Sequence, residues 1–268
     1  MQVLATVVRF IEQSLDNKFL AGDVVRALRV IARFLRAMQR SDQLDEMLEE
    51  LAFLNFWPAF RHLFLREFGR EPELTGKLAS ILALVPMGAA DDFARQFFAD
   101  HRDVFALVLR QTRERNPLVL AGFKFSALAN FCVAVPPMLG ELYRDGFFGE
   151  ILRLLDAGEG LPTGLLMCLH TFFKLGLHSD IDEFLEREAG FFEVLFGLMG
   201  RGGILAKDFV CVLEVLKKSF DFSASPDELL EHLKSHEEFV RALEVANSEH
   251  QNYVEDLELQ VMIETLLK

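Results

Sequence analysis

Two stretches of the chain share one pattern: Gly146-Phe-Phe-Gly-Glu-Ile-Leu152 and Gly190-Phe-Phe-Glu-Val-Leu-Phe196. In each, a small residue precedes an aromatic pair, and the pair opens an amphipathic helix. Aromatic residues open amphipathic helices at three other places, which gives five marker phenylalanines: Phe60, Phe105, Phe148, Phe192 and Phe239. Successive markers are 45, 43, 44 and 47 residues apart. Spacing this regular indicates an internal structural repeat.

Nearly every segment shows the 3.6-residue periodicity of an amphipathic helix. In residues 21–40, for example, apolar side chains gather on one face and four arginines on another. No segment alternates with a period of two, so the sequence predicts about fifteen helices and no strands. Each repeat is expected to hold three helices: its marker helix, then after a turn a longer apolar helix, and a short helix that leads into the next marker. We call the longer apolar helix the third helix. The predicted third helices span 72–86, 117–135, 162–177, 204–220 and 249–267.

A single unit of this kind cannot bury its apolar face, so neighbouring units must stack on a continuous core. The period fits armadillo and HEAT units, which are about 40–47 residues long. We therefore predict an all-α fold, a right-handed α-solenoid of armadillo/HEAT-like repeats. The alternative is a compact helical bundle in which the spacing of the markers is accidental. One solenoid is expected over residues 1–268, with a helical cap at 1–50, four to five repeats over 51–248 and a C-terminal capping helix at 249–268.

The composition supports a packed helical protein and disfavours some classes of partner. Half of the residues are hydrophobic (51%), which excludes a disordered chain. The 27 phenylalanines are expected to fill the space between stacked helices, the pairs Phe147/Phe148 and Phe191/Phe192 included. A net charge of −13 opposes binding to nucleic acid. No stretch is apolar for the roughly 18 residues that a membrane span needs.

The sequence carries no recognisable catalytic or metal-binding motif, so we expect neither an enzyme nor a bound cofactor. The three cysteines form no CxxC pair, and each falls in a third helix among apolar neighbours; they are Cys132, Cys168 and Cys211. We expect buried, inert thiols and a reducing compartment. His232 and His236 are spaced i, i+4, but no cysteine lies near them in the sequence, so no metal site is predicted there.

The segment Ser126-Ala-Leu-Ala-Asn130-Phe-Cys132 resembles the Ala-Leu-x-Asn-Leu pattern of an armadillo third helix. Together with residues 146–156 and 190–199 and the acidic tail from Ser235 onward, it is similar to the armadillo-type nucleotide exchange factors of heat-shock protein 70 chaperones. The resemblance covers about residues 120–268 and rests on a pattern of apolar and small residues. The N-terminal 100 residues add little to it.

The resemblance implies a co-chaperone whose concave face, lined by third helices, grips one lobe of the chaperone's nucleotide-binding domain and promotes ADP release. Basic residues near the starts of the third helices make contacts in that family, and Lys124 and Lys207 match such positions. Leu165 stands where a further basic residue would be expected, so the basic series is incomplete. Asn130 matches the groove asparagine of armadillo repeats in general.

The rival interpretation is a generic armadillo/HEAT scaffold that binds an extended peptide or another protein in its groove. In either case we expect a monomer that binds a protein partner and neither nucleic acid nor membrane. The first residues do not resemble a signal peptide, and the last do not form a retention signal, which favours the cytoplasm. The ER lumen is the alternative if a signal peptide has been removed.

Overall fold

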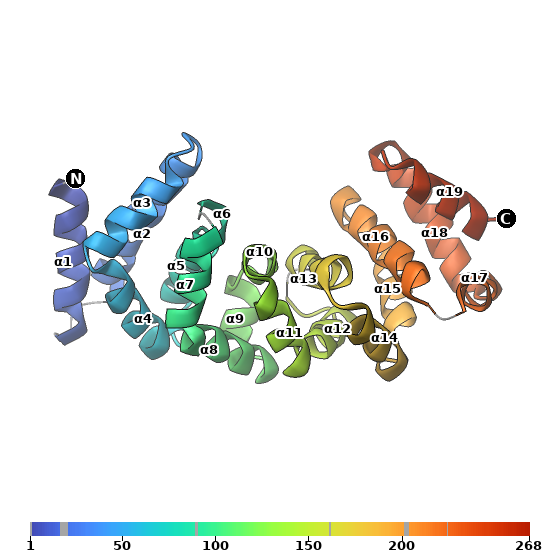
Figure 1. Ribbon diagram of the computed structural model, residues 1–268, viewed down its shortest axis with the longest axis horizontal. Coiled ribbons are helices and arrows are strands. Elements are labelled where there is room, and N and C mark those ends of the chain that lie inside the picture. The colour runs from blue at the N-terminus through green and yellow to red at the C-terminus, as the bar shows by residue number, and fades with distance from the viewer. Residues whose placement is uncertain (1, 17–20, 89–90, 161, 201–203, 224) are drawn as a thin grey trace. The chain divides into compact units, whose positions relative to one another are not determined.

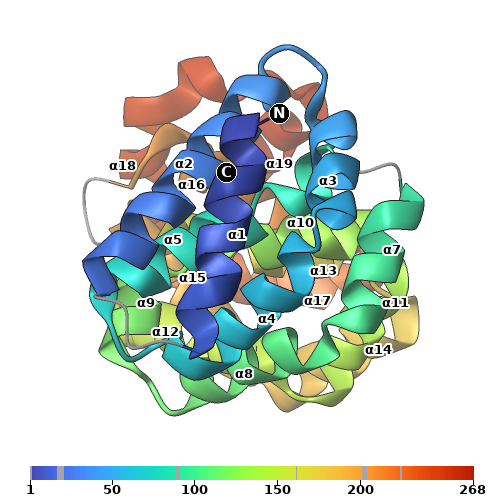
Figure 2. The same cartoon turned by 90° about the vertical axis from the view of Figure 1, so that its left-hand side faces the viewer.

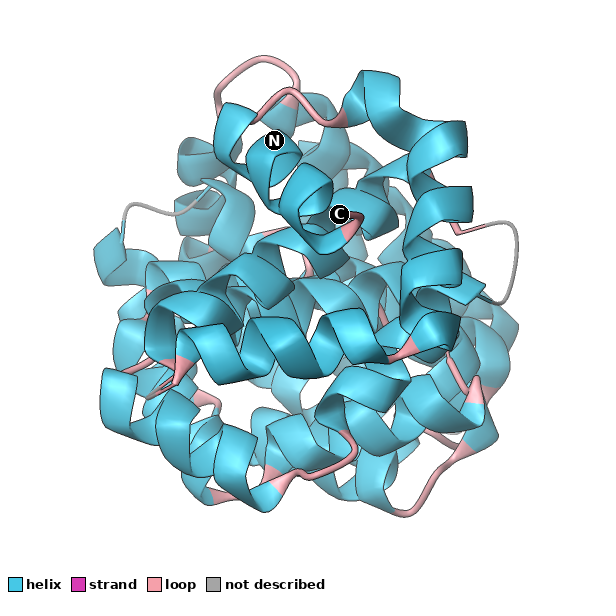
Figure 3. Ribbon diagram, turned by 90° about the vertical axis from the view of Figure 1, so that its right-hand side faces the viewer, coloured by secondary structure: helices cyan, strands magenta, loops and turns pink. Residues whose placement is uncertain are grey.

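The computed structural model describes residues 2–16, 21–88, 91–160, 162–200, 204–223 and 225–268 (Figure 1). Over these ranges the chain forms α-helices and one short 3₁₀-helix joined by short loops, with no strand (Figure 3). It divides into two compact units, Met1–Val135 and Pro136–Lys268, which we call unit 1 and unit 2. Each unit is described by itself.

Unit 1 is built from two rows of packed helices. Its helices are α1 (Gln2–Asp16), α2 (Ala21–Gln39), α3 (Leu44–Phe53), α4 (Phe56–Glu67), α5 (Pro72–Leu82), α6 (Val85–Gly88), α7 (Asp91–Asp100), α8 (Arg102–Arg113), α9 (Pro117–Gly122) and α10 (Ser126–Ala134). Helices α1, α4 and α8 pack in one row, and α2, α5 and α9 in the other, with α1 lying against both α2 and α4 (Figure 2). Helix α10 packs against α6 and α7.

Unit 2 repeats this arrangement. Its helices are α11 (Pro136–Arg144), α12 (Phe147–Ala157), α13 (Pro162–Leu175), α14 (His178–Arg187), α15 (Phe191–Gly200), α16 (Ala206–Phe222), α17 (Pro226–Ser235), α18 (Glu237–His250), the 3₁₀-helix η1 (Gln251–Tyr253) and α19 (Leu257–Leu266). Helices α12, α15 and α18 form one row, and α13, α16 and α19 form the row of third helices. Neighbouring rows bury the apolar faces that a single repeat would expose.

The five marker helices are confirmed, because each marker phenylalanine lies in the first turns of α4, α8, α12, α15 or α18. The prediction of an unbroken third helix over 117–135 is wrong. Helix α9 ends where Phe123 takes an extended backbone conformation, and the rings of Phe123 and Phe125 are fully buried edge to face across the break. Burial of the two rings against each other stabilises this break.

The predicted helix over 249–267 is likewise broken. After α18 the chain passes through η1 and the buried Val254, and α19 then starts anew at Leu257. The side chain of Asp256 caps this start by accepting hydrogen bonds from the backbone N–H groups of Glu258 and Leu259. A cap of this kind satisfies donors that a fresh helix would leave unpaired.

The expected phenylalanine core is confirmed for most of the aromatic pairs. Phe147, Phe148 and Phe191 are almost completely buried. Phe192 is only half-buried, which corrects its prediction; its ring lies beside those of Phe191 and Phe196. Phe192 therefore covers the edge of the core, whereas Phe191 lies inside it.

Phe172 of α13 joins several helices of unit 2. Its ring stacks on Phe148 of α12 with 4.3 Å between ring centroids and on Tyr143 of α11 with 5.4 Å. It also meets Phe184 of α14 edge to face at 5.4 Å. Because the side chain is fully buried, its removal leaves a large cavity at the meeting point of four helices.

We expect Phe172→Ala to lower the free energy of unfolding by about 3–5 kcal/mol. Urea unfolding followed by circular dichroism measures the change, since the single tryptophan, Trp57, reports only on unit 1. Val245→Ala, at an exposed position of α18, is the control and should change the stability by less than about 0.5 kcal/mol. Equal losses for the two variants would contradict the proposed role of the ring.

Candidate functional site

Helices α13, α16 and α19 of unit 2 follow one another in space (Figure 1), and polar side chains join each of them to the next. Between α13 and α16, the hydroxyl of Thr163 donates to the carboxylate of Asp208 at 2.9 Å. In the same pair of helices, His170 Nε2 lies 2.9 Å from Glu214 Oε2. Between α16 and α19, Lys217 forms an ion pair with Glu258. We call this polar surface the third-helix face of unit 2; its residues are Thr163, His170, Lys207, Cys211, Glu214, Lys217 and Glu258.

Lys207 lies on this face, in the first turn of α16, and its side chain is exposed. It forms no ion pair with any residue that the structure describes. Asp208, next in the chain, is buried, and its Oδ1 has no hydrogen-bond partner within the same part of the chain. The carboxylate of Asp208 is favoured in the first turn of α16 because the N-terminus of the helix carries partial positive charge. Among the residues that the structure describes, Lys207 thus has no ionic partner, and it lies on the surface of an acidic protein.

The other two predicted site residues belong to unit 1. Lys124 is exposed in the turn between α9 and α10, and its carbonyl accepts the N–H of Ala127 at 2.8 Å as α10 begins. Asn130 is half-buried on α10, and its side-chain amide bonds to no described residue. Both lie at or on a third helix, as the pattern predicts. Lys207 belongs to unit 2 and is described apart from them.

Leu165, at the remaining position of the expected basic series, is fully buried in α13. This position belongs to the core, so no side chain there could reach a partner. A buried leucine at this point explains why the basic series does not continue onto α13.

The prediction of buried thiols is confirmed for two of the three cysteines. Cys132 and Cys168 are buried, and burial raises the pKa of Cys132 to about 12. The prediction is wrong for Cys211, which is half-buried. Burial, with the carboxylates of Glu214 and Asp208, raises the pKa of Cys211 to about 11. Its surroundings are polar because α16 turns this side chain toward the third-helix face.

Cys211 belongs to a cluster that the sequence pattern did not reveal. One ligand atom each of His170, Cys211 and Glu214 lie within 4.8 Å of one another. Burial lowers the pKa of His170, although Glu214 opposes this effect, so the imidazole is neutral at pH 7. The sequence did contain one signal for the pairing of His170 with Glu214: the two residues are 44 positions apart, which is one repeat period.

His232 and His236 do not make a comparable cluster. Their rings lie edge to face with centroids 4.8 Å apart. Over the described ranges of the chain, they meet no further histidine, cysteine or carboxylate that would complete a group of three metal ligands.

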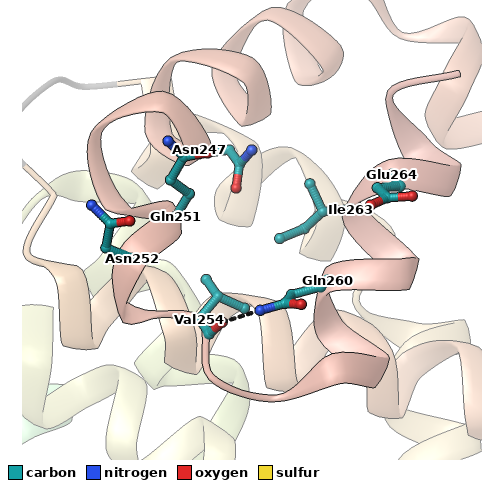
Figure 4. Close-up of a pocket in the computed structure, with 7 residues that line it drawn as sticks. All are labelled: Asn247, Gln251, Asn252, Val254, Gln260, Ile263 and Glu264. Carbon is teal, nitrogen blue, oxygen red and sulfur yellow. Dashed lines mark hydrogen bonds between the residues drawn. The ribbon is translucent and has the colours of Figure 1, made fainter.

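A polar pocket of about 260 Å³ lies at the C-terminal end of unit 2, between α18, η1 and α19 (Figure 4). Three amide side chains line the side formed by α18 and η1: Asn247, Gln251 and Asn252. On α19, Gln260 donates a hydrogen bond to the carbonyl of Val254 at 2.7 Å, which holds the connecting loop against the helix. Side-chain amides both donate and accept, so this pocket suits a peptide group or another amide.

Unit 1 has a larger cavity of about 410 Å³ between α4 and α7. Its wall is aromatic: Trp57 meets Phe97 edge to face at 5.1 Å, and Phe97 stacks on His101 at 4.2 Å. Arg61 stands at the edge of this cavity and pairs with Asp103 of α8. Helical periodicity alone does not predict this cavity, because the cavity depends on how Phe93 and Phe97 of α7 pack against Trp57 of α4.

No known protein family matches the chain, and no curated protein sequence does. Among solved structures, the chain is similar to the designed armadillo repeat protein YIII(Dq)4CqI, with a TM-score of 0.62. That likeness covers 98% of both chains at 13% sequence identity. The predicted fold class is thereby confirmed: the chain is an all-α solenoid of armadillo type.

Across the described ranges, no helix combines the length and the apolar character that crossing a bilayer requires.

The ion pair at the edge of the unit 1 cavity should make stability depend on pH. Arg61 donates to both carboxylate oxygens of Asp103, at 3.0 and 2.5 Å, and these bonds hold the pKa of Asp103 below its usual value. A depressed pKa adds stability above the unfolded value of about 4, and this stability is lost as the pH falls through the lower, folded value.

We expect Asp103→Asn to lower the stability at pH 7 by at most about 1 kcal/mol, since solvent screens a pair that is 48% and 38% exposed. The difference from the parent protein should shrink below pH 4. Thermal unfolding at pH 7 and pH 3 measures it, with Asp92→Asn, at a side chain that is 94% exposed, as the control. A difference that grows at pH 3 would contradict the assignment.

Proposed function

We propose that this chain binds a protein partner through its third-helix faces and that the partner is the nucleotide-binding domain of a heat-shock protein 70 chaperone. The observation that carries the proposal is Lys207, an exposed cation without an ion pair among the described residues, on the third-helix face of an acidic chain. Such a cation is free to contact an acidic partner surface. Exposed Leu205, immediately before α16, adds apolar surface beside it.

The choice of chaperone is supported by the resemblance of residues 120–268 to exchange factors and by the exposure of Lys124 and Lys207. The proposed mechanism is thermodynamic linkage. A factor that binds the opened lobe of the nucleotide-binding domain better than the closed lobe shifts the domain toward the open state. The open state holds ADP less tightly, so ADP release accelerates.

We also propose that the chain acts as a monomeric binding protein without catalysis or cofactor. The cytoplasm is the proposed compartment, and the ER lumen is the alternative.

A second candidate, binding of an extended peptide, is favoured by Asn130. Its amide is half-exposed on α10 and makes no hydrogen bond to the described part of the chain. An amide side chain offers both a donor and an acceptor and so matches the peptide group of an extended backbone. The chaperone candidate depends on Lys207 and the peptide candidate on Asn130, so substitutions at these two residues separate the candidates.

If the chaperone proposal holds, adding the protein to a chaperone loaded with fluorescent ADP should accelerate ADP release. Lys207→Glu should reduce the acceleration about tenfold, because a repulsive charge then replaces an attractive one at the interface. The variant should remain folded, since a glutamate in the first turn of α16 is favourable to the helix dipole. Stopped-flow fluorescence measures the release.

Lys234→Glu makes the same charge change in the last turn of α17, which is not a third helix, and should leave the acceleration unchanged. Equal losses in the two variants would remove Lys207 from the site. Absence of any acceleration, together with absence of co-elution with the chaperone, would overturn the chaperone proposal while leaving the armadillo-type fold intact.

If the peptide candidate holds, Asn130→Ala should weaken the binding of an extended peptide about two- to tenfold, which corresponds to losing a hydrogen bond of about 0.5–1.5 kcal/mol. Fluorescence anisotropy with a library of labelled peptides measures the affinity. Gln43→Ala, which removes an exposed amide at the start of α3, is the matched control. Unchanged binding by the Asn130 variant would count against this candidate.

A further inference from the structure

Three side chains of different chemistry meet on the third-helix face of unit 2. His170 comes from α13, and Cys211 and Glu214 come from α16. One nitrogen, sulfur or oxygen atom of each lies within 4.8 Å of the other two, and His170 Nε2 is 2.9 Å from Glu214 Oε2. Within the described ranges, this is the one group of three or more histidine, cysteine and acidic side chains close enough to share an ion.

The packing of two neighbouring third helices brings the cluster together. Cys211 and Glu214 are spaced i, i+3, so they occupy the same side of α16, one turn apart. Helix α13 packs directly against α16 and supplies His170 from one repeat earlier in the chain. All three side chains are held on helices, which position ligands more firmly than loops do.

The donor set identifies the class of ion. An imidazole nitrogen, a thiolate sulfur and a carboxylate oxygen are all ligands of Zn²⁺, whereas Mg²⁺ and Ca²⁺ prefer oxygen alone. Around tetrahedral zinc, with bonds of about 2.0–2.3 Å, ligand atoms lie about 3.3–3.8 Å apart. The ligand atoms of the cluster lie 2.9 Å apart for His170 and Glu214 and within 4.8 Å for all three, which brackets this spacing.

We propose that His170, Cys211 and Glu214 form a Zn²⁺-binding site that links α13 to α16 and leaves a fourth coordination position open. On zinc binding, the neutral imidazole of His170 offers one ring nitrogen to the ion and keeps its proton on the other, and the thiol of Cys211 gives up its proton to solvent. A water or a side chain of another molecule fills the fourth position. The proposal does not depend on the identity of the protein partner.

Charge and access both suit a divalent cation. One thiolate and one carboxylate carry two negative charges, which balance those of Zn²⁺. The side chain of His170 is 21% exposed and that of Glu214 is 40% exposed, so the ion can enter from solvent. Lys174 and Lys207 and the buried Asp208 are the other charged groups that act on the cluster. They contribute two positive charges and one negative charge at greater distance.

A hydrogen bond between His170 and Glu214 alone would account for that pair but gives no reason for Cys211 beside it. The chain provides a matched comparison in His178, which pairs with Asp182 at 3.2 Å on α14. That pair also joins an imidazole to a carboxylate, and it belongs to no three-membered group in the described residues. The two sites separate zinc binding from an ordinary histidine–carboxylate contact.

Co²⁺, which is coloured where Zn²⁺ is not, is the probe for the full-length reduced protein after chelator treatment. We expect one equivalent of Co²⁺ to give a thiolate-to-cobalt charge-transfer band and the visible bands of tetrahedral cobalt, and Zn²⁺ to displace both. Cys211→Ser should abolish the charge-transfer band, and His170→Gln should weaken binding at least tenfold. His178→Gln should bind as the parent protein does.

A measurement on the unaltered protein guards against variants that fail to fold. Zn²⁺ should slow the alkylation of Cys211 by iodoacetamide at least tenfold, with the site read out by peptide mass spectrometry. The buried Cys132 and Cys168 serve as internal references that react slowly in both conditions. Alkylation of Cys211 at the same rate with and without Zn²⁺, or a cobalt spectrum that survives Cys211→Ser, would overturn the proposal.

Discussion

Contact between the rows of helices is the constraint on which the rest of the structure depends. In unit 2, the row α12, α15, α18 and the row α13, α16, α19 bury their apolar faces against each other. A ring such as that of Phe172 is fully buried only because neighbouring helices cover it. Once the rows are fixed, each third helix has only one side left for solvent, and the polar contacts between third helices must lie there.

The same constraint explains how far the sequence could predict the fold. The spacing of five phenylalanines was enough to place the marker helices, because burial of an aromatic residue once per repeat is a local and periodic requirement. That pattern did not predict where the third helices end. The break at Phe123 depends on a tertiary site for two rings, and the restart of α19 depends on a cap by Asp256. Neither the site for the two rings nor the cap recurs with the repeat period.

The candidate site was predictable to a similar degree. The sequence placed Lys124, Asn130 and Lys207 on or beside third helices, and the structure leaves all three partly or fully accessible. It could not show that Leu165 points into the core or that Cys211 points out of it, because both depend on how each helix is rotated about its own axis. To predict that His170 pairs with Glu214, the rotations of both α13 and α16 about their axes must be known.

Lys207 and Cys211 are spaced i, i+4 on α16, so a partner and a metal ion on this face would act on each other. Without zinc, the cluster carries the charge of Glu214 alone, because His170 and the thiol are neutral at pH 7. With zinc, two anionic ligands and a dication sum to zero. The local charge thus rises by one beside Lys207, which strengthens attraction for an acidic surface. Linkage requires the converse: a partner held at Lys207 tightens zinc binding by the same factor.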